Sequence, residues 1–153
     1  MFNVVLVEPE IPPNTGNIGR LCLATGSRLH LVEPLGFSLD DRQLRRAGMD
    51  YWSKVSVSCW QNLVQFDQAT VSSQRRFLFT TKAKRLYWEI RFATDDYLIF
   101  GRETKGLPES FLAGYADSCF TIPMRAGARS LNLATSVAIV LFEAVRQLAH
   151  SGE

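Results

Sequence analysis

The sequence has little of several residue types on which common catalytic sites depend. Only two of its 153 residues are histidine, His30 and His150, and they lie far apart in the chain. A histidine-centred metal site or a serine–histidine–aspartate triad therefore has little to draw on. The sequence also shows no paired-carboxylate pattern. We therefore expect no bound metal, and a reaction that depends on positioning two bound molecules more than on strong acid–base groups.

Cysteine is scarce too. Cys22, Cys59 and Cys119 are an odd number at wide spacings, and they form no CxxC or other metal-ligand pattern. We therefore expect a cytoplasmic protein with free, mostly buried thiols. No apolar run reaches the length of a membrane span, and the first residues, MFNVVLVEPE, lack the basic region of a signal peptide. No membrane partner is expected.

The rest of the composition is that of an ordinary globular chain, with 46% hydrophobic and 21% charged residues. The length fits one domain over residues 1–153. The net charge is only +2, but the cations are clustered in three groups. These groups are Arg75, Arg76, Lys82, Lys84, Arg85 and Arg91; Arg125 and Arg129; and Arg42, Arg45 and Arg46. Such clusters attract a polyanion, although solvated loops explain the composition equally well.

Apolar runs and turn residues alternate along the chain as strand, helix, strand, helix. The pattern predicts strands at 2–8, 28–33, 55–57, 76–80, 97–100 and 119–122. It predicts helices at 14–25, 40–48, 59–67 and 130–150, with Asn14 or Thr15 capping the first, Gly26 ending it and Ser130 capping the last. Repeated β-then-α order implies an α/β fold with a mostly parallel sheet flanked by helices.

The last predicted helix is apolar on nearly all sides. Its polar residues form one narrow stripe, which consists of Asn132, Ser136, Glu143 and Gln147. A helix of this kind must be covered on more than one side. The sheet covers one side, so we expect a second copy of the chain to cover another in a homodimer.

Four segments follow predicted strands, and ligands of parallel α/β sheets bind beyond the carboxyl ends of strands. In residues 8–20, Asn17 and Arg20 share a helix face, and Arg20 is a fixed cation suited to gripping a phosphate. In residues 79–85, Lys82 is placed for a phosphate. A surface arginine and a solvated lysine are the simpler explanations of these two cations.

The other two segments carry glycine- or serine-marked turns. In residues 100–108, Gly101 allows a ligand to approach the backbone closely, and Gly106 permits a positive φ. Glu103 either holds a ligand amine or, as we favour, steadies the loop through main-chain N–H groups. In residues 121–134, the helix start at Ser130 offers N–H groups for polar or anionic ligand atoms.

These four segments, in this order, resemble the SpoU-like branch of the SPOUT RNA 2′-O-methyltransferases. The motifs are similar at Asn14–Arg20, Leu98–Pro108 and Ile122–Leu133, and the resemblance covers essentially the whole chain. The runs VEPEIPPNTGNIGRLC and LRRAGMDYW, and the lack of an added RNA-binding domain, resemble the members that act on the wobble nucleotide of leucine tRNAs.

The resemblance implies a C-terminal third threaded into a deep trefoil knot, an exception to the rule against knots. It implies S-adenosylmethionine as cofactor, S-adenosylhomocysteine as product, and a homodimer whose site lies between subunits. Carried over by position, the implied cofactor residues are Phe79, Thr80, Gly101, Glu103, Ile122, Met124, Ser130 and Leu131.

The activity implied is transfer of a methyl group to the ribose 2′-hydroxyl of cytidine or uridine 34 of tRNA. Arg20 matches the family's catalytic arginine, and Lys82, Arg129 and Ser130 would contact the tRNA. Arginine stays protonated in proteins, so we expect Arg20 to hold the ribose or its 3′-phosphate while a phosphate oxygen or water takes the proton.

Some positions depart from the family pattern. Gly19 stands mid-helix, which costs about 1 kcal/mol relative to alanine. Arg102 stands where proline is expected, and Ala134 where a small hydroxyl residue is common. A 2′-O-methyltransferase for another tRNA or rRNA position, a nucleotide- or NAD-binding Rossmann enzyme without its fingerprint, and a non-catalytic RNA-binding module remain alternatives.

Overall fold

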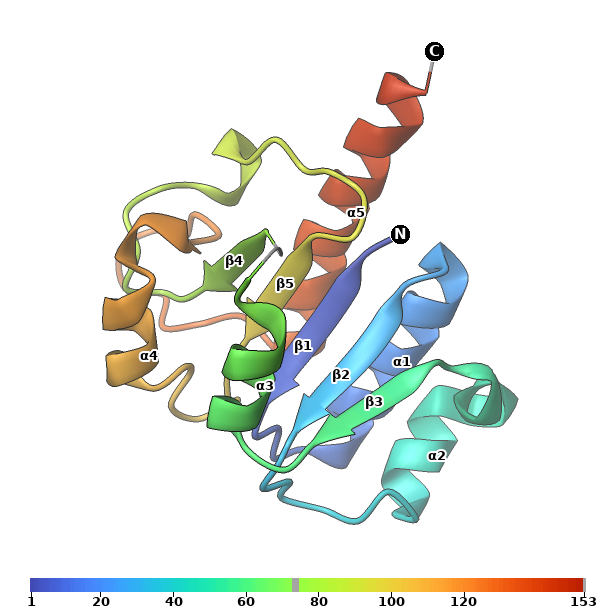
Figure 1. The fold of residues 1–153 in the computed structure, drawn as a ribbon. Coiled ribbons are helices and arrows are strands. Elements are labelled where there is room, and N and C mark those ends of the chain that lie inside the picture. Colours follow the sequence, from blue (N-terminus) through green and yellow to red (C-terminus); the bar gives the residue numbers. More distant parts are fainter. Residues whose placement is uncertain (73–74, 153) are drawn as a thin grey trace.

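The computed structural model describes residues 1–72 and 75–152, apart from the side chains of residues 48–50. Six strands form one sheet in the order β3-β2-β1-β5-β4-β6, and every neighbouring pair is parallel (Figure 1). The strands are β1 (Asn3–Val7), β2 (Arg28–Val32), β3 (Val57–Trp60), β4 (Arg76–Phe79), β5 (Tyr97–Phe100) and β6 (Cys119–Phe120). The predicted parallel α/β sheet is confirmed.

Helices cover both faces of this sheet. They are α1 (Pro12–Thr25), α2 (Arg42–Gly48), α3 (Leu63–Thr70), α4 (Glu109–Gly114) and α5 (Leu133–Ser151), with short 3-10 turns η1 (Met49–Lys54), η2 (Tyr87–Glu89) and η3 (Ala116–Ser118). Val4 and Leu6 of β1 pack in the core cluster that α1, α2 and α5 complete, while Val5 and Val7 pack in the cluster of α3 and α4. Successive residues of a strand face opposite sides, so β1 is buried on both.

The start of α1 differs from the prediction. The helix begins at Pro12 rather than near Asn14, and Pro12 and Pro13 occupy its first turn. Proline is tolerated there because the N–H groups of the first turn have no partner within the helix. Asn14 therefore lies buried inside the helix instead of capping it. At the other end Gly26 adopts the left-handed conformation, with φ of 66°, as predicted.

The prediction was also wrong between residues 55 and 70. The strand extends over Val57–Trp60, and the helix begins only at Leu63. Asn62 sets this boundary, because its side chain accepts a hydrogen bond of 2.8 Å from the main-chain N–H of Gln65. Cys59 consequently lies exposed on a strand, whereas Cys22 is buried and Cys119 is half-buried. The short helix α4 was not predicted at all.

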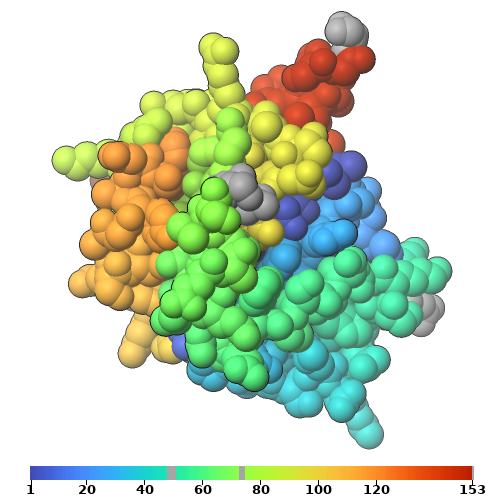
Figure 2. Space-filling view, viewed as in Figure 1, coloured from blue at the N-terminus to red at the C-terminus, as the bar shows by residue number. Residues whose placement is uncertain are grey.

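The last helix begins three residues later than predicted. Asn132, not Ser130, caps it, and its side-chain oxygen accepts hydrogen bonds from the main-chain N–H groups of Ala134 (2.9 Å) and Thr135 (3.3 Å). The row Leu133, Val137, Val140, Leu141 and Ala144 is buried. Phe142 is 46% exposed, and the final turns of α5 stand out from the body of the molecule (Figure 2). By length and composition alone α5 is apolar enough to cross a membrane; here its buried row packs in the core.

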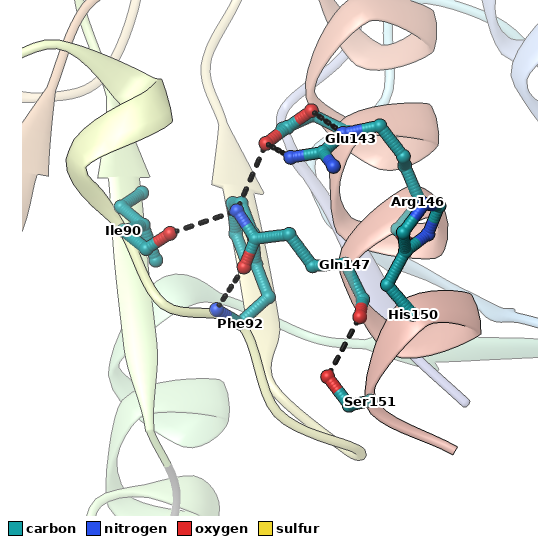
Figure 3. Close-up of polar contacts among 7 residues, drawn as sticks. All are labelled: Ile90, Phe92, Glu143, Arg146, Gln147, His150 and Ser151. Carbon is teal, nitrogen blue, oxygen red and sulfur yellow. Dashed lines mark hydrogen bonds and ion pairs between the residues drawn. The ribbon is translucent and has the colours of Figure 1, made fainter. Parts of the chain in front are cut away.

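The polar stripe of α5 has a structural role at Gln147 (Figure 3). Its side-chain nitrogen donates to the carbonyl of Ile90 (3.0 Å), and its side-chain oxygen accepts from the N–H of Phe92 (2.9 Å). Glu143 also accepts from Gln147 (2.9 Å) and from Arg146 (2.8 Å), and these hydrogen bonds lower the pKa of Glu143 to about 2. The segment that leads into β5 is thereby fastened to α5.

Two of the clustered cations form hydrogen bonds and ion pairs within the fold. Arg76 is buried and donates to Asp67 (2.6 Å) and to the hydroxyl of Tyr115 (2.6 Å). Arg75 pairs with the buried carboxylate of Asp96 at 2.8 Å. Their segment is therefore not a continuous basic face, and its remaining exposed cations are Lys82, Lys84, Arg85 and Arg91.

The glycine at position 19 also has a packing explanation. A Cβ atom there would lie 2.7 Å from a ring carbon of Trp52, closer than real contacts allow. Trp52 is buried, so the indole occupies the space that any side chain at position 19 would need. The departure at Gly19 is therefore explained by the packing of η1 against α1.

Candidate active site

A cavity of about 450 Å³ lies beyond the carboxyl ends of β4, β5 and β6, beside the start of α5. All eight residues of the predicted cofactor site line it: Phe79, Thr80, Gly101, Glu103, Ile122, Met124, Ser130 and Leu131. Lys82 and Arg129, predicted to contact RNA, line it as well. Residues up to 52 positions apart in the chain thus meet at one place, from Phe79 to Leu131.

Two aromatic rings form part of the cavity wall. Phe79 and Phe100 are partners across β4 and β5, and both are buried. Their rings stack with centroids 4.9 Å apart and an interplanar angle of 18°. Because both rings stand on central strands, this wall is rigid and apolar.

The loop of residues 101–107 closes on its own backbone. Arg102 and Gly106 exchange two main-chain hydrogen bonds, of 3.2 and 3.0 Å, and Gly106 has a φ of +68°. A Cβ on Gly101 would lie 2.1 Å from the carbonyl carbon of Gly106 and 2.2 Å from the nitrogen of Leu107. Glycine is thus required at 101 by the loop itself, a reason different from the ligand approach expected from the sequence.

Glu103 fastens this loop to the start of α1. Its carboxylate accepts hydrogen bonds from the main-chain N–H groups of Glu10 (2.9 Å) and Ile11 (2.6 Å). Burial raises the pKa of Glu103, and those main-chain hydrogen bonds oppose the rise. The loop-steadying role that we favoured from the sequence fits this geometry.

Two further contacts join the same loops. The hydroxyl of Thr104 donates to Glu10 at 2.7 Å, and this hydrogen bond lowers the pKa of Glu10. Arg102 donates to the carboxylate of Glu8 at 3.1 Å. Glu8 itself has a φ of +54°, an uncommon value for a residue with a side chain. Arg102, which stands where the family pattern led us to expect proline, therefore has a partner in Glu8.

The opposite wall, residues 121–131, is open. Every residue from Arg125 to Asn132 is exposed. Within it one turn is closed by a hydrogen bond of 3.1 Å from the N–H of Ala128 to the carbonyl of Arg125, and Gly127 has a φ of +93°. Arg129 and Ser130 line the cavity from this segment.

The cavity carries more positive than negative charge. Its lining includes the cations Lys82, Arg102, Lys105 and Arg129 against one carboxylate, Glu103. Lys82 lies at its edge and pairs with the exposed Glu109 at 2.8 Å, which lowers the pKa of Glu109. An opening of this sign favours a phosphate-bearing ligand.

The chain matches the SpoU rRNA Methylase family over residues 1–142. It belongs to that family. A tRNA (cytidine(34)-2'-O)-methyltransferase of Burkholderia pseudomallei (strain 1106a) is 48% identical over 154 residues, which cover 99% of both chains. A solved structure described as "Structural insights into the 2-OH methylation of C/U34 on tRNA" superposes with a TM-score of 0.94 at 43% identity, covering 98% of this chain and 97% of the other.

A third similar protein is the AdoMet-bound rRNA methyltransferase of Sinorhizobium meliloti. It superposes with a TM-score of 0.86 at 28% identity, covering 96% of this chain and 56% of that one. The resemblance to the SpoU-like methyltransferases that the sequence motifs indicated is thus confirmed.

In this SpoU methylase, Arg20 does not line the cavity. It is exposed on α1, which the structure joins to the cavity rim through Asn132, whose side chain donates to Asn14 at 3.0 Å. The link was missed from the sequence, although an asparagine just before an apolar helical run is a recognisable cap signal. Arg20 therefore stands outside the cavity of its own chain.

His30 is a core residue. The indole N–H of Trp60 donates to its Nδ1 (3.1 Å), so its Nε2 donates to the side-chain oxygen of Asn3 (2.9 Å). Burial lowers the pKa of His30 to about 4. In the part of the chain that the structure describes, no group of three or more histidine, cysteine, aspartate or glutamate side chains is placed to hold a metal ion.

Proposed function

We propose that this chain is an S-adenosylmethionine-dependent tRNA 2′-O-methyltransferase that modifies the ribose of nucleotide 34. The observation that carries this proposal is the 48% identity, over 99% of both chains, to a tRNA (cytidine(34)-2'-O)-methyltransferase. Leucine isoacceptors are the substrates we expect. The proposal includes one domain over residues 1–153, the deep trefoil knot in its C-terminal third, and a cytoplasmic location with its tRNA.

The lining of the cavity fits S-adenosylmethionine. Its volume of about 450 Å³ lies in the range of small-molecule sites. Phe79 and Phe100 supply an apolar wall, and the segments around Gly101, Ile122 and Ser130 supply main-chain groups. The similar Sinorhizobium meliloti methyltransferase is AdoMet-bound. When bound, S-adenosylmethionine supplies an electrophilic methyl group.

The remaining residues would act on the RNA. Lys82, Arg129 and Ser130 lie at the mouth of the cavity, where they would hold phosphate and ribose oxygens. Arg20 would hold the ribose or its 3′-phosphate so that the 2′-hydroxyl is aligned, while a phosphate oxygen or water takes its proton. Alignment rather than a strong base would then supply most of the acceleration.

Arg20 can play this part only if a second copy brings it to the cavity, because it does not line the cavity of its own chain. Phe142 of α5 is an exposed apolar side chain that such a second copy would cover. We therefore propose a homodimer in which Arg20 of the partner subunit completes each site.

Methyl transfer is tested by incubating the protein with labelled S-adenosylmethionine and bulk tRNA, then mapping the modified nucleotide. The expected product is a 2′-O-methylated ribose at position 34. Label on a base, or no transfer, would contradict the proposal. Transfer to another tRNA position or to rRNA would select the alternative substrates within the family.

The shared site is tested by mixing two inactive variants. Arg20→Ala is expected to abolish methyl transfer while S-adenosylhomocysteine still binds, and Gly101→Val to abolish cofactor binding. In mixed dimers one site carries both defects and the other carries neither, so random mixing restores about a quarter of the wild-type activity. No recovery after subunit exchange would contradict a site built from two copies.

A further inference from the structure

A second cavity adjoins the first. Its volume is about 470 Å³, and it lies between residues 80–85, which follow β4, and the helix α4. Thr80 and Lys82 line both cavities. A molecule in the first cavity and a molecule in the second would therefore touch the same two residues.

One wall of the second cavity is apolar and is open to solvent at its two alanines. Ala113 and Ala116 line it, together with Leu112 and Cys119. Small side chains leave flat space beside the helix, and a planar ring can lie against such a surface. The nucleobase is the planar group that an RNA chain offers, and sequence-tolerant RNA sites use its face.

The rim is positively charged. Lys82, Lys84 and Arg85 line it, against the single carboxylate of Glu109. Arg85 is held in place, because it donates to the carbonyl oxygen of Asp117 at 2.9 Å and lies 4.5 Å above the centre of the Phe120 ring. Neither Lys84 nor Arg85 forms an ion pair with any carboxylate among residues 1–72 and 75–152.

We infer that the second cavity binds a nucleotide next to the methylated one, with its base against Ala113 and Ala116 and its phosphate at Lys84 and Arg85. The inference rests on the proposed function, since it takes RNA as the substrate. Continuity through Thr80 and Lys82 and the positive rim favour this occupant over a protein segment. The second cavity would then govern affinity for tRNA and leave the cofactor site unaffected.

The first test places a carboxylate in the cavity wall with Ala113→Glu. Glutamate is a good helix former, so α4 should tolerate it. The expected result is a rise of about tenfold or more in KM for tRNA, from like-charge repulsion of the phosphate, with kcat and the affinity for S-adenosylhomocysteine changed less than about twofold. Ala69→Glu, on the exposed surface of α3 and away from both cavities, is the matched control.

An equal rise in KM for both variants would show a general charge effect and would overturn the inference. An unchanged KM in Ala113→Glu would overturn it too, and would leave a protein segment as the candidate occupant.

The second test asks which nucleotide is bound and does not require methyl transfer. Anticodon stem-loop RNAs with an abasic residue at position 33 or 35 are titrated against each protein by fluorescence anisotropy. One of the two is expected to bind the wild type about 5- to 100-fold more weakly than intact RNA, the range for a lost stacked base. The same RNA should bind Ala113→Glu no more weakly than intact RNA does.

The absence of such coupling at both positions would overturn the inference even if position 34 is methylated. Coupling without methyl transfer would instead retain the second cavity as an RNA site and reject the proposed function. The two failures are therefore distinguishable.

Discussion

The two walls of the first cavity are built in opposite ways. The wall of residues 101–107 is fastened to residues 8–11, just before α1, by Glu103, Thr104 and Arg102 and leaves no space at Gly101. In the wall of residues 121–131, every residue from Arg125 onward is exposed, and one turn is closed by an internal hydrogen bond. A preformed wall lowers the entropic cost of holding a small ligand, whereas an open wall can adjust to a large one. The first wall therefore suits the cofactor alone, whereas the second, which also carries Ser130 and Leu131 of the proposed cofactor site, can adjust to RNA.

The largest loss of cofactor affinity is expected when a glycine of the first wall is replaced by alanine. In Gly101→Ala the new Cβ would lie 2.1 Å from the carbonyl carbon of Gly106, so the loop must open. We expect a loss of at least about 100-fold in affinity for S-adenosylhomocysteine by titration calorimetry, with about 2–4 kcal/mol of stability lost on unfolding.

The matched change in the open wall is Gly127→Ala. A Cβ there meets nothing within 4 Å, although the φ of +93° makes the substitution strained. Only about 1–2 kcal/mol of local strain is expected, with little change in cofactor affinity. Equal losses of affinity at the two glycines would contradict the contrast between the walls.

The next effect is expected at the carboxylate that fastens the first wall. Glu103→Gln removes a charged acceptor from two main-chain N–H groups at 2.9 and 2.6 Å. We expect a loss of about 1–3 kcal/mol in the free energy of unfolding and a roughly tenfold weaker cofactor affinity. Glu33→Gln, on an exposed residue, controls for the change of charge and should leave both quantities unchanged.

A substitution in the open wall should show the reverse pattern. Arg129 is exposed and lines the cavity, so Arg129→Ala should leave the unfolding midpoint and the cofactor affinity unchanged. Loss of a phosphate contact should raise KM for tRNA about five- to tenfold and reduce its dependence on salt. A lower unfolding midpoint in this variant would show that the second wall is also structural.

The smallest effect is a dependence on pH at Glu10. The Thr104 hydroxyl lowers the pKa of Glu10 below 4.5, so this carboxylate stabilises the fold above that pH and loses its contribution as the pH falls through the lowered pKa. Glu10→Gln should unfold at a slightly lower temperature than the wild type at pH 6. The difference should shrink as the pH falls through the lowered pKa of Glu10; a difference that does not change with pH would contradict the assignment.

The sequence predicted the larger features of the fold because they depend on short-range patterns. The apolar run of β1 and the glycine after α1 were both read correctly. The first residues of α3 and α5 were predicted wrongly. Asn62 and Asn132 cap these helices in competition with neighbouring polar residues such as Ser130. Which of these residues caps the helix depends on the path of the preceding segment, and that path is not encoded in a local sequence pattern.

The members of the cavity were also predictable, since the carboxyl ends of parallel strands meet at one edge of a sheet. The hydrogen bonds that join these segments to α1 were not predictable. Glu103 and Ile11 are 92 positions apart, and Asn132 and Asn14 are 118 apart. Charge patterning failed at Arg76 for a related reason. A buried arginine that pairs with the distant Tyr115 looks the same in sequence as a solvated arginine.

Gln147 sets the rotation of α5 about its own axis. Its amide presents an acceptor and a donor to Phe92 and Ile90, as one peptide unit of a neighbouring strand would. With that residue turned towards the segment before β5, the helical step of about 100° per residue places Phe142, five positions earlier, about 140° away around the axis. The two hydrogen bonds of Gln147, together with the buried row of α5, thus fix which surface of the helix is offered to another molecule.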